Sequence, residues 1–329
     1  MKLLKMLRLC ALKSDNPSKF AVEGSIVPLI DRLETASELQ AKKYAPHQLQ
    51  EIQQALKAKD NRLRAVSYNL RFDCMDHLLE PIHRWPSRLP RALRLLEYLD
   101  FDILGVQEPY QNQIQDLLKT LSPTYAFFSK LSSTGEINGV FYRKKRFELL
   151  GSHAWAMTSK EKRLDTLTLV QLKDRLTRHS LAVFNTHLSY PNIEKREQQA
   201  LFISEIIEKW ASRMPILLMG DFNSFPNRGD LEGLPFHDGD YIHRLLTRGT
   251  IRDARTHSLL GHLGPTGTYT NIGMNPAPFK GYGMPGLFLD HIYISPGVKV
   301  LVHAVEPAKV GGQFPSDHMP IITDILLGC

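Results

Sequence analysis

The pattern of hydrophobic and polar positions divides the chain into short blocks, most of which lie after residue 60. Alternating or continuous apolar runs of about four to eight residues predict strands, whereas apolar residues at helical spacing predict amphipathic helices. The expected strands are Leu63–Leu70, Phe101–Val106, Tyr125–Phe128, Ile137–Tyr142, Phe147–Trp155, Thr166–Leu172, Ser180–Phe184, Pro215–Met219, Leu287–Ile294 and Ile321–Leu327. The expected helices are Pro86–Leu99, Tyr110–Leu121, Ile193–Trp210 and, within a loop-rich region over Pro226–Pro285, a short one over Tyr241–Leu246.

Residues 1–60 predict a helical N-terminal extension that precedes a catalytic domain over residues 61–329. Ser37–Ala58 is rich in Gln, Ala, Leu and Lys and predicts a helix that restarts at Pro46. Met1–Lys13 predicts a basic amphipathic helix, which either makes a weak contact with a membrane surface or packs and frays. Lys5 and Arg8 interrupt it, so it makes a poor signal-peptide core.

Composition changes this picture only a little. The 329 residues are 43% hydrophobic and 23% charged, which suits one large or two ordinary globular domains. Residues 1–60 carry ten Lys and Arg against seven Asp and Glu, so +3 of the net charge of +7 lies there and +4 in the rest. This mild basicity is compatible with nucleic acid or anionic lipid and diagnostic of neither.

The three cysteines, Cys10, Cys74 and Cys329, are far apart and form no Cys-x-x-Cys pair. This spacing argues against a disulfide framework or a cysteine zinc site and fits a reducing compartment. No apolar run reaches the length of a bilayer-spanning helix. We therefore expect a cytoplasmic monomer, with secretion left open.

The stretch Leu217–Pro226 carries the first sign of chemistry. Its apolar run stops at Gly220, and Asp221 and Asn223 follow on the same side of an extended backbone. Polar groups that a rigid strand holds at the start of a loop commonly do chemistry, although these residues could also simply turn the chain.

The same event recurs at the ends of other strands. Polar side chains follow apolar runs at Asn69, Glu108, His187, Asp290 and the pair Asp317 and His318. If these ends converge, carboxylates and amide oxygens without thiolates suit Mg²⁺ or Mn²⁺. Histidine beside aspartate suits proton transfer. Together they predict metal-assisted attack of water on phosphorus.

The motifs at these strand ends resemble those of the endonuclease/exonuclease/phosphatase superfamily, the DNase I-like proteins, over roughly Leu63–Leu327. The matching pieces, in family order, are Ser67–Asn69, Gly105–Glu108, Asn185–Leu188, Gly220–Asn223, Leu289–Ile292 and Ser316–His318. Each alone is a weak signal, but all six in order are specific. Tyr68–Asp73, Trp85–Arg88, Phe141–Arg143 and Gly267–Thr270 are similar to the bacterial branch of the superfamily.

The resemblance implies an α/β (α+β) fold in which two mainly antiparallel sheets pack face to face and helices flank them, a four-layer sandwich. It also implies a divalent metal, Mg²⁺ or Mn²⁺. Glu108 would be its principal ligand, with Asn69 and Asp317 close to the metal.

The resemblance further implies the roles of the remaining strand-end residues. Asp221 would orient or deprotonate the attacking water, while Asn223 and His187 would hold the phosphoryl oxygens or the leaving group. Asp290 would pair with His318. Members of the family differ in the identity of the base, so Asp221 and His318 are joint candidates.

Several residues keep a structural alternative. Arg71 predicts either a substrate phosphate clamp or a salt bridge, and Trp85 and Arg88 either border a substrate groove or form a structural lid. Arg143–Arg146 predicts a solvated hairpin turn or a phosphate contact, and Pro276–Pro285 a substrate loop or a plain surface loop. Glu108 could be a surface carboxylate, His187 a core histidine and Asp290 a turn former. We interpret ten further histidines as ordinary: His77, His83, His153, His179, His237, His243, His257, His262, His291 and His303.

The leading functional prediction is a Mg²⁺-dependent phosphoesterase of the nuclease type that hydrolyses phosphodiester bonds. The alternatives are a lipid or small-molecule phosphatase, such as a sphingomyelinase-like or sugar-phosphate enzyme, and a catalytically dead binding module. Arg71 stands where the abasic-site nucleases usually carry an acidic residue. Phe288–Ile292 lacks the Cys-Asp-Arg signature of the phosphoinositide 5-phosphatases. The sequence therefore predicts the reaction without its natural substrate.

Overall fold

A computed structural model describes residues 20–33, 46–58, 61–130, 135–157, 165–225, 238–270 and 286–328. Some predictions fall outside these residues. They are the helix over Met1–Lys13, the first part of the helix over Ser37–Ala58, and the loop over Pro276–Pro285. Cys10, Cys329 and His237 lie there too.

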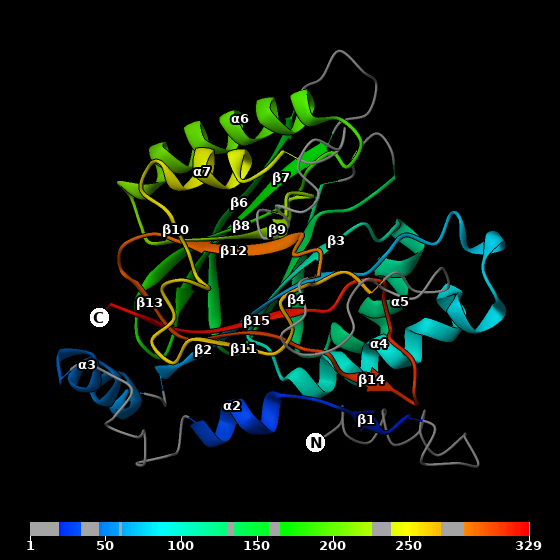
Figure 1. Ribbon diagram of the computed structural model, residues 1–329, viewed down its shortest axis with the longest axis horizontal. Coiled ribbons are helices and arrows are strands. Elements are labelled where there is room, and N and C mark those ends of the chain that lie inside the picture. The colour runs from blue at the N-terminus through cyan, green and yellow to red at the C-terminus, as the bar shows by residue number, and fades with distance from the viewer. Residues whose placement is uncertain are drawn as a thin grey trace.

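Two β-sheets form the centre of the protein (Figure 1). Most neighbouring strands run antiparallel, and the parallel pairs are β2 with β3, β8 with β9 and β11 with β13. The seven-stranded sheet has the order β11 (His262–Leu263), β13 (Val298–Val305), β15 (Ile321–Leu327), β2 (Leu63–Asn69), β3 (Ile103–Gln107), β5 (Gly139–Arg143) and β4 (Tyr125–Phe128). The six-stranded sheet has the order β10 (Arg252–Asp253), β12 (Asp290–Ile294), β9 (Ile216–Asp221), β8 (Ser180–His187), β7 (Asp165–Asp174) and β6 (Phe147–Met157).

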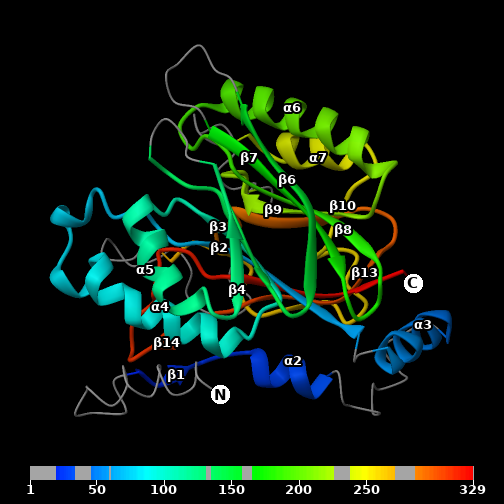
Figure 2. The ribbon, with the colours of Figure 1, turned by 180° about the vertical axis from the view of Figure 1, so that it is seen from behind.

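Three hydrophobic cores separate four layers, because each sheet buries both of its faces. One core fills the space between the sheets and includes Val183 and Met219 from one sheet and Ala65 and Ile325 from the other. The second lies under α6 (Ile193–Ala211) and α7 (Tyr241–Thr247). The third lies under α2 (Val27–Leu33), α4 (Trp85–Leu99) and α5 (Gln111–Leu121), on the far side of the other sheet (Figure 2). This arrangement confirms the predicted four-layer sandwich.

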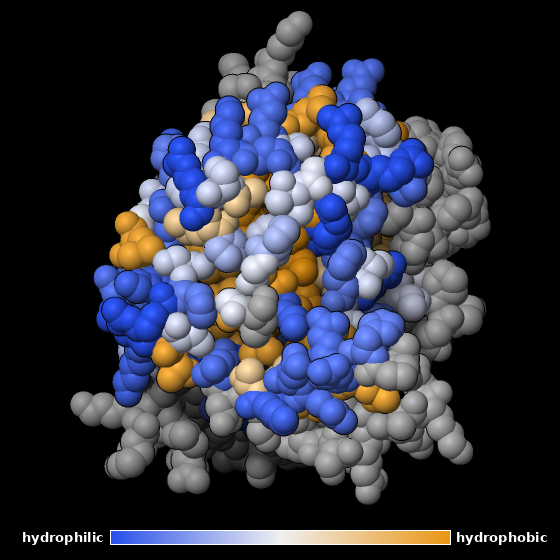
Figure 3. All heavy atoms as spheres, turned by 90° about the vertical axis from the view of Figure 1, so that its left-hand side faces the viewer, coloured by the Kyte–Doolittle hydropathy of each residue, from blue (hydrophilic) through white to orange (hydrophobic). Residues whose placement is uncertain are grey.

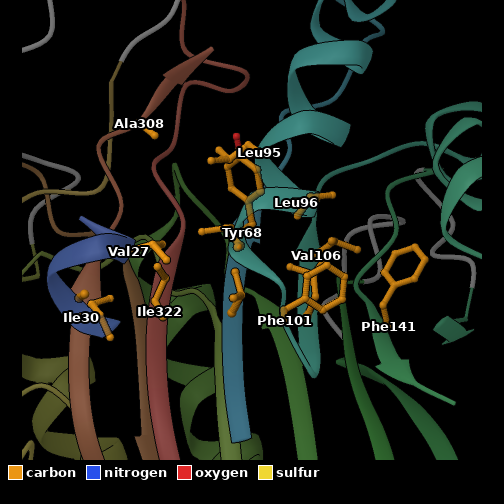
Figure 4. Packing of buried hydrophobic residues seen from close by; sticks show 14 of the residues in the cluster. Val27, Ile30, Tyr68, Leu95, Leu96, Phe101, Val106, Phe141, Ala308 and Ile322 are labelled. Atoms are coloured by element: carbon orange, nitrogen blue, oxygen red, sulfur yellow. The ribbon is translucent and has the colours of Figure 1, made fainter. Parts of the chain in front are cut away.

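The described part of the first 60 residues packs on the larger sheet. β1 (Val22–Glu23) pairs with β14 (Lys309–Val310), and α3 (Pro46–Lys57) buries Ile52. Val27 and Ile30 of α2 lie next to Ile322 of β15 (Figure 4). These residues therefore belong to the same hydrophobic core as α4, while the domain boundary at residue 60 stays a prediction.

Strand β13 is the main element that the sequence interpretation missed, and β12 is shorter than predicted. Strand β12 begins at Asp290 instead of Leu287, and the N–H groups of Leu289 and Asp290 both donate to the hydroxyl of Thr268. Short 3₁₀ turns, η3 (Asp76–Leu78) and η4 (Pro81–His83), follow β2. One face of the molecule carries mostly hydrophilic residues with hydrophobic ones between them (Figure 3). Among the described residues, the helices are too short or too polar to span a membrane.

Candidate active site

Asp221 lies at the centre of the strand ends that the sequence singled out. β9 runs between β8 and β12, and their registers place His187 opposite Asp221 on one side and Asp290 opposite it on the other. In the facing sheet, Asn69 ends β2 opposite Gln107, the residue before Glu108. Both sheets therefore bring their polar side chains to the same edge of the sandwich.

Asn69 connects the two sheets at this edge. Its Nδ2 donates to Glu108 Oε1 at 2.8 Å and to Asp221 Oδ2 at 2.9 Å, while its Oδ1 accepts the N–H of Arg71. The other oxygen of Glu108 accepts the N–H of Phe72. Glu108 also has a φ of 72°, which residues other than glycine seldom adopt and which often marks a functional site.

Gly220 allows β9 to approach β8 closely. A Cβ atom at this position would lie 2.1 Å from the carbonyl oxygen of Thr186, so only glycine fits without a backbone shift. The chain then turns at Asn223, whose φ is 49° and whose N–H donates to Asp221 Oδ1 at 2.9 Å. The turn predicted after the strand is thus present, and it also holds the Asp221 carboxylate.

Two imidazoles flank the carboxylate of Asp221. His187 Nε2 and His318 Nε2 each lie 3.7 Å from Asp221 Oδ2. His318 Nδ1 lies 2.7 Å from Asp290 Oδ2, which makes Nδ1 the donor and directs Nε2 towards Asp221. On the other side, the Asn223 side-chain nitrogen lies 3.0 Å from His187 Nε2. The structure therefore brings together the five residues predicted to be catalytic.

Burial and neighbouring charges shift the pKa values of these groups. Burial raises the pKa of Asp221, and the nearby Asp290 raises it further. Burial also raises the pKa of Glu108. For His318, burial acts to lower the pKa, but the charges of Asp290 and Asp221 outweigh it and hold the pKa well above its ordinary value. The pKa of His187 is raised in the same way, against burial, by Asp221 and Glu108.

The residues around Asp221 form two groups that could hold a metal ion. They are Glu108, His187 and Asp221, and Asp221, Asp290 and His318; within each group the potential ligand atoms lie within 4.8 Å of one another. Buried carboxylates that repel one another are stabilised by a cation, so the donor set fits a divalent ion. In this arrangement Asn69 presents its amide nitrogen to the carboxylates.

Arg71 makes the salt bridge that was one of its two predicted roles. Its Nη1 donates to Asp76 Oδ1 at 2.6 Å, and its Nε lies 3.6 Å from Asp317 Oδ2. Asp317 also accepts a hydrogen bond from the hydroxyl of Ser316 at 3.3 Å. Asp317 thus lies beside the site in contact with Arg71, and a direct contact of either residue with metal or substrate stays a prediction.

Trp85 and Arg88 are structural and border no groove, because they are 3% and 0% exposed. Arg88 Nη1 donates to the carbonyl oxygens of Leu70 at 2.7 Å and Pro315 at 3.3 Å, and its Nη2 to that of Arg71 at 3.2 Å. One guanidinium therefore holds the loops that follow Asn69 and precede Ser316.

The basic cluster Arg143–Arg146 is a turn between β5 and β6, at the end of β5 opposite to Glu108. Arg143 Nε lies 3.0 Å from Asp102, and Arg146 Nε lies 3.1 Å from Asp174. The prediction of a hairpin was wrong, because β5 and β6 belong to different sheets and do not pair; the cluster is a turn that carries the chain from one sheet to the other, and it lies away from the site.

Two neighbours of His187 and His318 were not predicted. The Tyr269 ring packs edge-on against His318 with 5.3 Å between centroids, and burial raises the pKa of Tyr269 to about 12. Glu136 Oε2 lies 3.9 Å from His187 Nδ1. The sequence offered a signal for Tyr269, because this residue belongs to the Gly267–Thr270 motif. Glu136 had none, because it precedes a strand instead of ending one.

Comparison with known proteins agrees with the α/β sandwich. The fold and the site define a protein of the DNase I-like class. The chain belongs to the Endonuclease/Exonuclease/phosphatase family, whose sequence model matches residues 66–318. This membership confirms the resemblance that the six motifs predicted, and with it the enzyme class, the phosphoester hydrolases of this family.

Individual relatives share parts of the chain. Protein angel homolog 2 of Mus musculus is 28% identical over 168 residues, which are 46% of this chain and 31% of the relative, so the chain spans about a third of its length. The endonuclease/exonuclease/phosphatase from Bacteroides vulgatus is 25% identical with a TM-score of 0.67 and covers 81% of this chain and 99% of its own. The structure of ANGEL2, a 2',3'-cyclic phosphatase, in complex with adenosine-2',3'-vanadate has a TM-score of 0.59 at 17% identity. The match covers 82% of this chain and 96% of the ANGEL2 chain. This last likeness shows the fold alone.

Proposed function

We propose that this chain is a divalent-metal-dependent phosphoesterase that hydrolyses phosphodiester bonds of nucleic acid through attack of an activated water on phosphorus. One observation carries the proposal: Asp221 Oδ2 lies 3.7 Å from both His187 Nε2 and His318 Nε2 and accepts a hydrogen bond from Asn69, which also binds Glu108. A single carboxylate thus joins a group suited to a cation with a group suited to proton transfer.

Glu108 and Asp221 would hold the cation, with Asn69 bridging them and Asp317 nearby. Mg²⁺ and Mn²⁺ fit best, because these ions prefer carboxylate oxygens and substrate phosphate. When bound, the ion supplies positive charge to the phosphate oxygens. Its presence would also offset the repulsion from neighbouring carboxylates, because Asp317 acts to raise the pKa of Glu108 and Asp290 acts to raise that of Asp221.

Asp221 and His318 are the candidates for the group that takes the proton of the attacking water. The Asp290 carboxylate binds Nδ1–H of His318 and favours its imidazolium form, in which Nε2 is a donor. An imidazolium donates to a phosphoryl oxygen better than it accepts a proton, which favours Asp221 Oδ2 as the acceptor. Asp290 then acts as a positioning residue for His318.

His187 and Asn223 would bind the oxygens on which negative charge develops. Asn223 Nδ2 donates to the carbonyl oxygen of Leu188 at 2.9 Å and lies 3.0 Å from His187 Nε2, which accepts from it in the neutral ring. The imidazolium, which the raised pKa of His187 favours, would instead donate from Nε2 to a substrate oxygen that displaces this contact. Preorganised donors of this kind each contribute about 10²-fold to 10³-fold in rate. The two side chains lie side by side and would contact neighbouring oxygens of one phosphoryl group.

Nucleic acid is the proposed substrate class. The mild positive charge of the chain is compatible with it, and the ANGEL2 structure is that of a 2',3'-cyclic phosphatase with a bound adenosine derivative. Lipid and sugar phosphates are the competing substrates.

Asp221→Asn tests the proposal. We expect the variant to lose at least about a hundredfold in the rate of hydrolysis of bis-p-nitrophenyl phosphate and of an RNA oligonucleotide ending in a 2',3'-cyclic phosphate. Asp100→Asn is the matched control, because Asp100 is exposed and has a φ of 47°, a conformation that asparagine tolerates. Full activity of Asp221→Asn, or of the wild type in excess EDTA, would overturn the mechanism, and preference for a lipid or sugar phosphate over RNA would overturn the substrate class.

A further inference from the structure

A second cluster of metal-binding side chains lies on the other face of the six-stranded sheet. His243, Asp253 and His291 each offer a ligand atom, and these atoms lie within 4.8 Å of one another. Side chains alternate along a strand, so His291 and Tyr293 point to the face opposite to Asp290. Asp253 pairs with Tyr293 in the register and shares this face, and α7 covers it with His243. Three elements thus converge here, apart from the site around Asp221.

Each of the three side chains is oriented by a partner outside the cluster. His291 Nε2 lies 3.1 Å from the carbonyl oxygen of Phe288 and 3.2 Å from that of Ser224, so Nε2 carries the proton. Asp253 Oδ1 accepts the N–H of Arg255 at 2.7 Å. His243 Nδ1 lies 3.3 Å from the hydroxyl oxygen of Tyr293. Partners of this kind fix the ring tautomers and ligand orientations at known metal sites.

One of the remaining ligand atoms lacks the hydrogen bond expected of a buried polar group. His291 is 2% exposed, and its Nδ1 makes no hydrogen bond within the described residues. His243 Nε2 and Asp253 Oδ2 are 3.9 Å apart, which is too long for a hydrogen bond. A buried acceptor without a donor is unfavourable, and a cation would compensate for it.

We propose that His243 Nε2, Asp253 Oδ2 and His291 Nδ1 bind a divalent transition-metal ion of the Zn²⁺ type. Two imidazoles and one carboxylate are a common donor set for Zn²⁺ and related ions, whereas Mg²⁺ prefers oxygen ligands. Arg255 places a positive charge nearby, but its guanidinium lies over the ring of Phe288 at 4.7 Å. The site is independent of the proposed catalytic function.

Such an ion would connect the outer helix layer to the active-site edge. His291 follows Asp290 directly, and its ring nitrogen binds the carbonyl oxygen of Ser224, the residue after Asn223. The ion would therefore hold α7, β10 and β12 in a fixed arrangement beneath the loop that carries Asn223. The expected role is structural, since the cluster points away from Asp221.

Co²⁺ is a suitable probe, because its visible absorption reports imidazole coordination independently of enzyme activity. The full chain, stripped of metal by a chelator and dialysed, is titrated with Co²⁺, and bound metal is quantified by mass spectrometry. We expect one more equivalent of Co²⁺ in the wild type than in His243→Gln or Asp253→Asn. Zn²⁺ should raise the thermal midpoint of the wild type more than that of His243→Gln, which keeps only the group around Asp221; equal rises would count against the second cluster.

Two control variants separate this site from its surroundings. Glu108→Gln lies in the group around Asp221 and should still bind Co²⁺ through the second cluster. His153→Gln, an exposed histidine on β6, should bind as the wild type does. Equal Co²⁺ binding by the wild type, His243→Gln and Asp253→Asn would overturn the proposal. So would the absence of Co²⁺ binding by Glu108→Gln, a result that does not depend on the folding of the second-cluster variants.

Discussion

Glu306 provides a quantitative prediction about how the first residues are held to the catalytic fold. This fully buried carboxyl follows β13 and accepts hydrogen bonds from the hydroxyl of Ser25 at 2.9 Å and the N–H of Ile26 at 3.3 Å. Burial raises its pKa to about 7 from an ordinary value of 4.5, although these hydrogen bonds partly oppose the shift. The folded protein therefore binds this proton more tightly than the unfolded chain does.

The sign and size of the effect follow from linkage. The stabilisation is fully present below about pH 4.5, falls as the pH rises, and is lost above about pH 7, where both states are ionised. At 1.36 kcal/mol for each pKa unit, the loss across this window is about 3 kcal/mol. Glu306→Gln has no titratable group at this position. Its free energy of unfolding should therefore rise relative to that of the wild type by the same amount between pH 4.5 and pH 8.

Urea unfolding followed by circular dichroism at several pH values measures this difference. Glu23→Gln is the control, because Glu23 is an exposed glutamate in the same N-terminal segment. We expect the control to follow the wild type at every pH. A constant difference between Glu306→Gln and the wild type from pH 4.5 to pH 8 would refute the reasoning, since it would mean that Glu306 titrates alike in both states.

Two further predictions concern the residues that position the site. Asp290→Asn removes the charge that raises the pKa of His318, so nuclear magnetic resonance titration of the imidazole should show the pKa falling; an unchanged titration would contradict the proposed pairing. Arg88→Met leaves the buried carbonyl oxygens of Leu70 and Pro315 without their donor, while that of Arg71 keeps the Nε2 of Gln113, and should lower the free energy of unfolding by about 2–4 kcal/mol in urea. Arg94→Met, on the exposed side of the same helix, should change it little, and equal values for the two variants would count against the role of Arg88.

The sequence predicted the strand-end residues because their spacing is a local property. Asp221 and Asn223 follow an apolar run directly, and the alternation of a strand places them on one side. The resemblance supplied the two-sheet sandwich, and the strand register of the structure then explains why His187 and Asp290 lie on either side of Asp221. Arg71 shows the limit of this reasoning. Whether Arg71 contacts substrate or forms a salt bridge depends on the position of Asp76, and the spacing of residues along the chain does not predict that position.

Residues whose function depends on contacts between distant segments could not be predicted in the same way. Neither His243 nor Asp253 lies in a motif, and His291 resembled any packing histidine in a strand until the register of β10 and the position of α7 were known. Neighbouring residues of β12 thus belong to two different clusters. Asp290 faces the site between the sheets, and its neighbour His291 faces the helices, so a one-residue change of register would exchange the two side chains. Because Gly220, opposite His291, fixes the approach of β9 to β8, the geometry of the catalytic edge and that of the second cluster depend on the same backbone.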